Sequence, residues 1–429
     1  MPSVEEVFDA GDYPEYTYVR RERRRLDERL ERVLGSSTPG ASIIGPSKSG
    51  KTALVKNTAR EKDFTIIQIR GPQIGSVDEL WSLVLDELGA PETTEEHRGD
   101  TTEDGRTTTA GAKPGGTGID HAESERDTST TGQTRSFGRR GLRGVKTRSE
   151  VADFVLLIDD FHYIDSRELK KNIVQSIKGA IEDKIPVCVA FVTHRGETLQ
   201  ELVPDIDDRV MSIPCDLWAT EELVQIAEKG QDPLNIRFTD EMKEKLADNA
   251  IRSPMIMQRL CSAACAVAGI SGTHDPESEA KEIDLSDEEF DRAIERAADW
   301  MGKRSVVREM AGGVNDSGRV EYDYGGQQDG DTYILGLRAI AQGDTDRNFH
   351  FSDLKQRMQD DCVDDSPNGP QIENFCSQME RIAKEERPNE DLVEWDNEKN
   401  VLTISDPELL FLIRYLMRDD DFQMRLAAI

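Results

Sequence analysis

The sequence predicts an α/β domain built on a parallel sheet, then a helical subdomain, then a C-terminal winged-helix-like domain. Apolar, strand-like runs alternate with helical patterns over the first half of the chain, which is typical of a parallel sheet. From residue 218 the pattern is purely helical. Towards the C-terminus three helices precede a β-hairpin, which is the order of elements in a winged helix.

The elements of the α/β domain are expected in this order: helix 15–35, strand 41–44, strand 64–70, helix 77–89, strand 154–159, helix 166–184 and strand 186–192. Residues 91–150 interrupt this series and are rich in Thr, Gly, Ser, Asp and Glu. Such a composition cannot bury enough apolar surface to offset its ordering entropy, so we expect a disordered insertion. Its basic end is interpreted as a solvated segment, with nucleic-acid contact as the alternative (Arg135, Arg139, Arg140, Arg143, Lys146 and Arg148).

In the helical subdomain, Thr239 is expected to cap one helix, and Ser253-Pro254 to begin a second that Gly269 closes. An acidic linker at 271–285, a helix at 286–302 and a Gly/Asp-rich stretch at 311–331 follow. The C-terminal elements are helices 332–342, 352–361 and 370–386, hairpin strands 392–395 and 401–404, and helix 407–418. The predicted division is 1–216 for the α/β core with its insertion, 217–270 for the helical lid, 271–331 for the linker and helix, and 332–429 for the winged-helix-like domain.

The 429 residues include 85 acidic and 54 basic side chains, giving a net charge of −31. The acids occur in every segment and arginine outnumbers lysine, which predicts a halophilic protein of haloarchaeal type. Such a surface repels nucleic acid at low salt, but high salt screens the repulsion and leaves a DNA partner open.

Several classes of protein are excluded by other patterns. No apolar run is long enough to cross a bilayer, and the first residues, MPSVEEVFDAGDYPEY, lack the regions of a signal peptide. The cysteines form no C-x-x-C pair and no zinc pattern with histidine, which predicts buried thiols in a reducing cytoplasm.

Residues 45–52 read GPSKSGKT and match the phosphate-binding pattern G-x-x-x-x-G-K-[ST] at every fixed position. The motif follows a predicted strand and opens a predicted helix, whose N-terminus attracts anions. Lys51 is expected to reach the β and γ phosphates of ATP, and the Thr52 hydroxyl to bind Mg²⁺. The loop residues that would cradle the phosphates are Gly45, Pro46, Ser47, Lys48, Ser49 and Gly50. The alternative is a chance match, at odds of roughly one in a hundred.

The strand FVLLIDD at 154–160 ends in two acids. Asp159 is expected at the carboxyl end of a buried strand, where it would bind the same Mg²⁺, and Asp160 beside it would orient or deprotonate the attacking water. An acidic turn after a strand is the alternative.

Other side chains are candidates for sensing the nucleotide. Thr193, after the strand PVCVAFV, is expected to sense the γ-phosphate or to be a solvated strand end. Arg209 is an arginine-finger candidate for a neighbouring subunit, although pairing with nearby aspartates is the favoured interpretation. Arg252 and Arg259 flank the Ser253-Pro254 cap, and either could reach the phosphates from the lid.

GPSKSGKT, LLIDDFHYI, the THR after the third strand and RSPMIMQRLC together resemble AAA+ and STAND-type P-loop ATPases, and most of all archaeal and bacterial ATPases related to origin-recognition proteins. The resemblance implies that YVRRERRRLDERL helps to bracket adenine and that RSPMIMQRLC is the lid helix carrying a sensor arginine. The sequence departs from that family in two places. Asp160 stands where hydrolytic AAA+ motors usually carry Glu, which implies a slow ATPase, and the arginine nearest the lid motif is displaced to Arg259.

Two functions follow as hypotheses. The first is an ATP-binding, slowly hydrolysing switch that couples its nucleotide to a protein partner or to self-association. The second is a DNA-binding ATPase of the origin-recognition or loader type, acting through its winged helix. The expected recognition helix, 371–386, carries more acids than bases, so a protein partner is favoured. A small-molecule kinase is a third, less favoured possibility.

Overall fold

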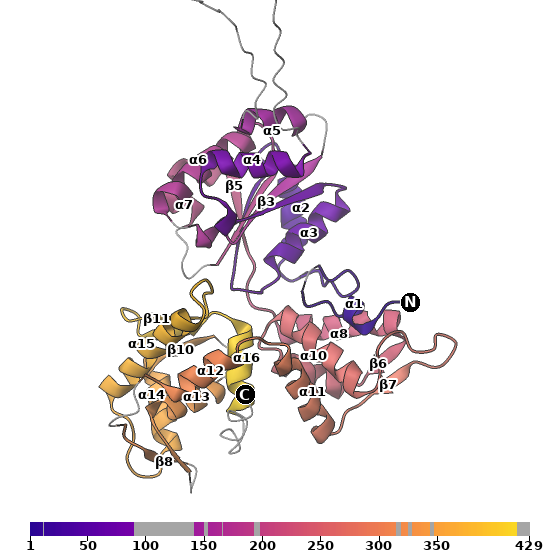
Figure 1. Cartoon of the computed structure of the whole chain (residues 1–429). Helices are drawn as coiled ribbons and strands as arrows, with labels where there is room; N and C mark the ends of the chain where they lie inside the picture. The colour runs from indigo at the N-terminus through magenta and orange to yellow at the C-terminus, as the bar shows by residue number, and fades with distance from the viewer. Residues whose placement is uncertain are drawn as a thin grey trace, which may run out of the picture.

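The computed structural model describes residues 1–11, 13–89, 141–149, 153–164, 166–192, 198–314, 319–324, 328–343 and 347–417. An α/β domain forms one end of the molecule, and two mainly helical parts lie side by side at the other end (Figure 1). Within the described residues no helix is both long and apolar enough to cross a bilayer. All six cysteines are free thiols.

The α/β domain is a five-stranded parallel sheet in the order β2-β3-β4-β1-β5. The strands are β1 (Gly40–Ile44), β2 (Thr65–Arg70), β3 (Phe154–Asp159), β4 (Val187–Phe191) and β5 (Val210–Pro214). Every residue of β3 and β4 is buried, because helices cover both faces of the sheet. This confirms the predicted parallel sheet and places the carboxyl ends of β1 and β3 at one edge.

Two groups of helices cover the sheet. One face packs against α2 (Leu26–Leu34) and α3 (Lys51–Glu61). The other packs against α4 (Val77–Glu87), α5 (Gly141–Ser149) and α6 (Arg167–Glu182), and the short α7 (Leu199–Leu202) follows β4. Since each helix connects or flanks parallel strands, its N-terminus points to the edge where the strands end.

Helix α5 corrects the predicted extent of the insertion. Residues 141–149, expected to be disordered, form a helix whose Val145 is fully buried and whose Leu142 packs against the same core. These two side chains lie three residues apart and therefore share one helical face, towards α4 and α6. The other residues of the predicted insertion, 91–140 and 150, lie outside the described residues.

The helix predicted over 15–35 is also shorter than expected, because it begins only at Leu26. Arg25 has a left-handed backbone, with φ of 49°, and Arg21 is buried and pairs with Glu222 at 3.1 Å. The guanidinium of Arg21 also donates to the carbonyls of residues 216 and 217. These long-range contacts hold the preceding segment out of the helix, and its first turn, α1 (Val4–Val7), packs on the lid.

The lid contains α8 (Thr220–Leu234), β6 (Ile236–Phe238), α9 (Asp240–Asn249), α10 (Pro254–Val267), β7 (Lys281–Ile283) and α11 (Asp287–Asp299). The parallel pair β6 and β7 is a departure from the purely helical prediction. Thr239 caps α9 as expected, accepting from the Met242 amide at 3.2 Å. Ser253 occupies the N-cap position of α10, although its side chain makes no capping bond.

The C-terminal part contains α12 (Arg304–Gly312), β8 (Tyr322–Tyr324), β9 (Gln328–Gly330), α13 (Thr332–Ala341), β10 (Asn348–His350), α14 (Phe351–Asp361), α15 (Gly369–Glu386), β11 (Val393–Asp396), β12 (Val401–Ile404) and α16 (Pro407–Leu416). Strands β10, β12 and β11 form an antiparallel sheet in that order. The three helices before a hairpin have the order expected for a winged-helix-like domain, with β10 as an additional strand between the first two. One apolar core runs through this part and the lid.

Candidate nucleotide-binding site

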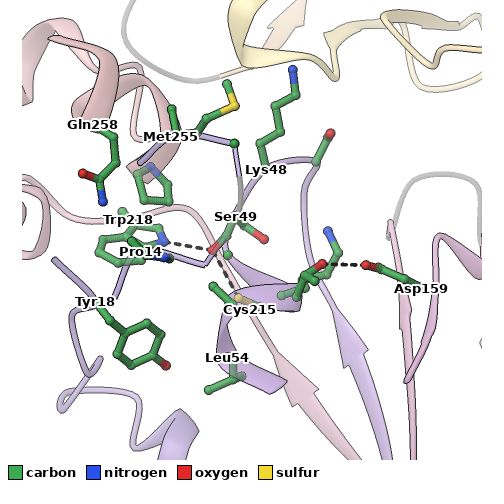
Figure 2. A pocket seen from close by; sticks show the side chains of 18 of the residues that line it. Pro14, Tyr18, Lys48, Ser49, Leu54, Asp159, Cys215, Trp218, Met255 and Gln258 are labelled. Atoms are coloured by element: carbon green, nitrogen blue, oxygen red, sulfur yellow. Dashed lines mark hydrogen bonds between the residues drawn. The ribbon is translucent and has the colours of Figure 1, made fainter. Parts of the chain in front are cut away.

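The phosphate-binding motif forms the loop between β1 and α3 (Figure 2). A Cβ atom at Gly45 would lie 2.0 Å from the carbonyl oxygen of Cys215, so no larger residue fits there. Gly50 has φ of 92°, a left-handed conformation that favours glycine. The loop turns tightly and leads directly into the N-terminus of α3, which suits it to anion binding.

Lys51 lies inside this loop. Its Nζ donates to the carbonyl of Gly45 at 3.0 Å and to that of Pro46 at 2.7 Å. Burial lowers the pKa of Lys51, and the nearby carboxylates of Asp159 and Asp160 oppose that shift. A buried cation enclosed by backbone can offset the charge of an anion seated in the loop.

Thr52 and Asp159 are in direct contact. The Thr52 hydroxyl donates to Oδ2 of Asp159 at 2.7 Å, and the Asp160 amide donates to Oδ1 at 3.0 Å. Gln68 on β2 donates from Nε2 to the same Oδ2 at 2.9 Å. Gln68 was not among the predicted site residues, although a single amide among the isoleucines of β2 is a signal that could have found it.

Asp160 follows β3 with a left-handed backbone, at φ of 54°. Burial, and after it the neighbouring Asp159, raise the pKa of Asp160. The Asp160 carboxylate is therefore a stronger base than that of an exposed aspartate.

A cavity of about 550 Å³ extends from this loop to the lid and the N-terminal segment. Its phosphate end is lined by the loop and by Asp159 and Asp160. Its other end is mostly apolar, and Figure 2 shows Pro14, Tyr18, Leu54, Trp218 and Met255 around it. Trp218 and Cys215 both bond to the Ser49 carbonyl, Nε1 at 2.9 Å and Sγ at 3.4 Å, and so tie the loop to the lid connection.

Residues 41–214 match the family model described as the ATPase family associated with various cellular activities (AAA). This part of the chain is an AAA-family ATPase domain. The match contains the loop, Lys51, Thr52 and both acids that follow β3.

Several solved structures align with most of the chain at low sequence identity. The Walker-type ATPase PABY2304 of Pyrococcus abyssi is 13% identical, with 95% of this chain and 99% of that chain covered and a TM-score of 0.49. The RuvB Holliday junction branch migration motor of Thermotoga maritima is 13% identical over 90% and 92% of the two chains, with a TM-score of 0.39. The Aeropyrum pernix ORC1 protein, solved in complex with DNA, is 12% identical over 96% and 95%, also at 0.39. No curated protein matches the chain.

The remaining predicted residues of the AAA domain lie elsewhere. Thr193 is outside the described residues. Arg209 precedes β5, at the edge of the sheet opposite the loop, and its Nε donates to Glu182 at 2.9 Å. Its ion-pair partner is thus Glu182 on α6, and its Nη1 also donates to the Asp205 carbonyl at 2.8 Å. An arginine finger at Arg209 stays a prediction that needs a second subunit.

The two lid arginines both make contacts within the protein. Nε of Arg252 donates to the Trp218 carbonyl at 3.1 Å. Arg259 forms an ion pair with Glu408 of α16 at 2.8 Å and donates to the Trp300 carbonyl at 2.9 Å. A sensor role for either arginine therefore stays a prediction.

The C-terminal part touches the AAA domain at the loop itself. Nζ of Lys48 lies 2.9 Å from Oδ2 of Asp406 and 2.6 Å from Oε2 of Glu408. The buried Arg347 donates to the Ser47 carbonyl at 2.9 Å, and burial lowers the pKa of Arg347 to about 10. Two adjacent residues of the phosphate-binding loop are therefore contacts of the C-terminal part.

A second contact lies beside Asp160. The backbone amide of Asp391, in the loop between α15 and β11, donates to the Tyr163 hydroxyl at 3.1 Å. Nε2 of His162 lies 3.8 Å from the Asp391 carboxylate, and His162 is packed against the Tyr163 ring. The His162 side chain is thus buried, with the Tyr163 ring and the Asp391 carboxylate as neighbours.

Proposed function

We propose that this chain is an ATP-dependent molecular switch, whose AAA domain binds ATP with Mg²⁺ and hydrolyses it slowly. The backbone of residues 45–50 would cradle the phosphates, and Lys51 would exchange its two carbonyl partners for phosphate oxygens. Thr52 and Asp159 would hold Mg²⁺, which offsets charge on the phosphates. The contact between these two side chains supports the assignment.

Asp160 would orient the attacking water and accept its proton. Its raised pKa suits a general base better than that of an exposed aspartate. An aspartate reaches less far than a glutamate, which supports slow turnover. Thr193 as a γ-phosphate sensor and Arg209 as a finger towards another subunit belong to the same proposal.

The observation that carries the switch is the pairing of Lys48 with α16. Lys48 belongs to the loop that would hold the phosphates, whereas Asp406 and Glu408 belong to the C-terminal part. A nucleotide that changes the loop therefore changes the free energy of this contact, and by reciprocity the contact changes nucleotide affinity.

Three parts of the molecule meet at Glu408. Besides Lys48, it pairs with Arg259 of the lid at 2.8 Å and with Lys303 of the segment between α11 and α12 at 2.7 Å. Because Glu408 is only 6% exposed, these pairs are poorly screened by salt. The cluster can therefore couple the loop to the C-terminal part even in molar salt.

Hydrogen exchange of the full chain in molar KCl tests the switch. We expect ATP to change the amide protection of α16, and Glu408→Gln to reduce that change severalfold. Glu390→Gln is the matched control, because Glu390 contacts Lys303 at 3.4 Å but is 42% exposed at its side chain. Identical α16 protection with and without ATP, under conditions where ATP is bound, would contradict the switch.

DNA binding through the winged-helix-like domain is the alternative. On α15, Arg381 pairs with Glu385 at 3.2 Å and Lys384 with Glu380 at 2.6 Å. Basic groups that are already paired offer little to a phosphate backbone, so we expect weak duplex binding with a shallow salt dependence. Tight binding with a steep log–log salt slope, or ATPase activity stimulated by duplex DNA, would favour a DNA-binding ATPase instead.

A further inference from the structure

Asp27 is a buried carboxylate at the apolar end of the cavity. It is the second residue of α2, it lines the cavity, and it is only 4% exposed. Within the described part of the chain no ion pair involves Asp27. Burying an unpaired carboxylate is costly unless hydrogen-bond donors surround it.

One oxygen of Asp27 has donors and the other has none among the described residues. Oδ1 accepts from the Tyr18 hydroxyl at 2.7 Å and from Nδ2 of Asn57 at 3.1 Å. The Tyr13 hydroxyl donates to Oδ1 of Asn57 at 2.7 Å, which turns the amide nitrogen of Asn57 towards Asp27. The network orients the carboxylate and leaves Oδ2, on a residue that lines the cavity, able to accept a further hydrogen bond.

Asp27 lies where the nucleobase of a bound nucleotide would be expected, rather than where its phosphates would be. Its partner Asn57 lies six residues after Lys51 on α3, or about 9 Å along the helix axis. The surrounding walls are Pro14, Tyr18, Leu54 and Trp218 (Figure 2). Flat apolar walls beside a fixed acceptor suit a nucleobase that presents a donor.

We propose that Oδ2 of Asp27 accepts a hydrogen bond from the exocyclic amino group of adenine and thereby selects ATP over 6-oxopurine nucleotides. This inference rests on the proposed ATP site. The O6 atom of hypoxanthine or guanine would face a carboxylate and be repelled. Guanine could pair through both of its ring-edge donors only if both carboxylate oxygens were available, and Oδ1 is already occupied by two donors.

The wild-type chain tests this directly. Binding of ATP, purine riboside triphosphate, ITP and GTP is measured by calorimetry in molar KCl. We expect ATP to bind at least about tenfold more tightly than purine riboside triphosphate, which lacks the amino group, and ITP to bind more weakly still. Equal affinities for ATP and purine riboside triphosphate, each weakened at least about tenfold by Lys51→Ala, would overturn the role of Asp27 while leaving the proposed ATP site intact.

The Asp27→Asn variant provides a second test, because it replaces a carboxylate oxygen with an amide donor. The oxygen of the new amide would keep its donors Tyr18 and Asn57, so the amide nitrogen would face the base. We therefore expect ATP to lose about tenfold in affinity and ITP, whose O6 accepts a hydrogen bond, to gain. An unchanged ratio of ATP to ITP affinity in a folded Asp27→Asn chain would overturn the proposal.

Glu28→Gln is the matched control. Glu28 is the next residue in the first turn of α2, and its side chain is 54% exposed. The Glu28→Gln substitution removes the same charge from the helix N-terminus without touching the cavity. The preference for ATP over ITP should therefore stay as in the wild type. A base preference altered equally by both variants would overturn the proposal. If no triphosphate binds the wild-type chain, the proposed function fails, and this inference fails with it.

Discussion

At the residue scale, Lys51 and Asp159 illustrate how the site combines local and distant groups. Lys51 takes its position from the loop, five and six residues away, through two carbonyls. Asp159 takes its orientation from Thr52 and Gln68, which belong to α3 and to the neighbouring strand. The cation is therefore held by its own loop, whereas the carboxylate is held by the assembled sheet.

Lys51→Ala should weaken ATP binding by about 10- to 100-fold, because a charge-assisted hydrogen bond contributes about 1.5–3 kcal/mol. Titration calorimetry measures the affinity, and circular dichroism checks that the fold persists. Lys62→Ala, at the exposed end of the same helix, is the control. Wild-type affinity in a folded Lys51→Ala chain would remove this lysine from the site.

Gln68→Ala should raise the Mg²⁺ concentration needed for half-maximal turnover by about tenfold, since residues that orient metal ligands have effects of this size. Its amide no longer holds Oδ2 of Asp159, whereas the phosphate contacts stay. Nucleotide affinity measured without Mg²⁺ should therefore be unchanged. Gln225→Ala, on the exposed face of α8, should leave both quantities alone. A Mg²⁺ requirement unaffected by Gln68→Ala would show that Gln68 does not position Asp159.

At the element scale, the N-terminus of α16 combines capping with ion pairing. Asp406 accepts from the amides of Glu408 at 2.8 Å and Leu409 at 3.0 Å, and its carboxylate also pairs with Lys48 and with Lys303 at 3.3 Å. Burial alone would raise the pKa of Asp406 and of Glu408, but the two lysines outweigh it and hold both pKa values below the ordinary range. This helix end is thus both a structural cap and a charge cluster.

These lowered pKa values predict a loss of stability in acid. The unfolded carboxyls protonate near pH 4, so between that pH and the lower folded values the unfolded chain binds more protons. The stabilisation is complete above about pH 5 and is lost as the pH falls through the folded pKa values. We expect the free energy of unfolding, from denaturant titrations at constant KCl, to fall steeply below about pH 4.

Asp406→Asn should reduce that acid sensitivity. Asparagine caps a helix as well as aspartate does, so the variant removes the charge and keeps the cap. At neutral pH the variant should lose about 3 kcal/mol in its free energy of unfolding, which is the cost of breaking a buried ion pair. Asp396→Asn, at the end of β11, removes an exposed pair with Lys399 and should leave the free energy of unfolding close to that of the wild type. If the free energy of unfolding of Asp406→Asn fell as steeply below about pH 4 as that of the wild type, this cluster would not be the cause of the acid sensitivity.

At the scale of the whole molecule, the insertion joins two helices of the AAA domain that lie side by side. Helix α4 ends at Glu87 and α5 begins at Gly141, and the two helices pack against each other. Arg148, in the last turn of α5, donates to the Leu88 carbonyl at 3.1 Å, so the two helices end close together. Gly141, where the chain re-enters, lies about 10 Å away along the axis of α5. A glycine linker of several residues can therefore span the gap left by removing residues 91–139.

Deleting residues 91–139 and joining the ends with a short glycine linker should leave the melting temperature within a few degrees of the wild type. Extending the deletion through residue 149 removes α5 and exposes the surface that Val145 covers. Loss of such a buried side chain costs about 1.5–3 kcal/mol, which shifts the melting temperature of a large domain by several degrees. Equal melting temperatures for the two deletions would show that α5 contributes nothing to the core.

Local patterns in the sequence determined much of the fold and the centre of the site. The loop 45–52, the acidic end of the third strand and the amphipathic helices each depend on residues within one or two turns of one another, so spacing alone identifies them. For the same reason α5 was missed, because its two apolar residues become a signal only when α4 and α6 are present to cover them.

Only the tertiary structure decided which side chains surround the phosphate-binding loop and the acids that follow β3. Gln68 lies 91 residues from Asp159, and Lys48 lies 360 residues from Glu408. Asp27 likewise acquires its orientation from Asn57 on another helix. The spacing of residues in the sequence shows which side chains are neighbours within one helix or strand. These contacts depend instead on which helices and strands pack together. For that reason the sequence could predict the phosphate-binding loop. It could not predict that α16 contacts the loop, or that the buried carboxylate of Asp27 lines the same cavity.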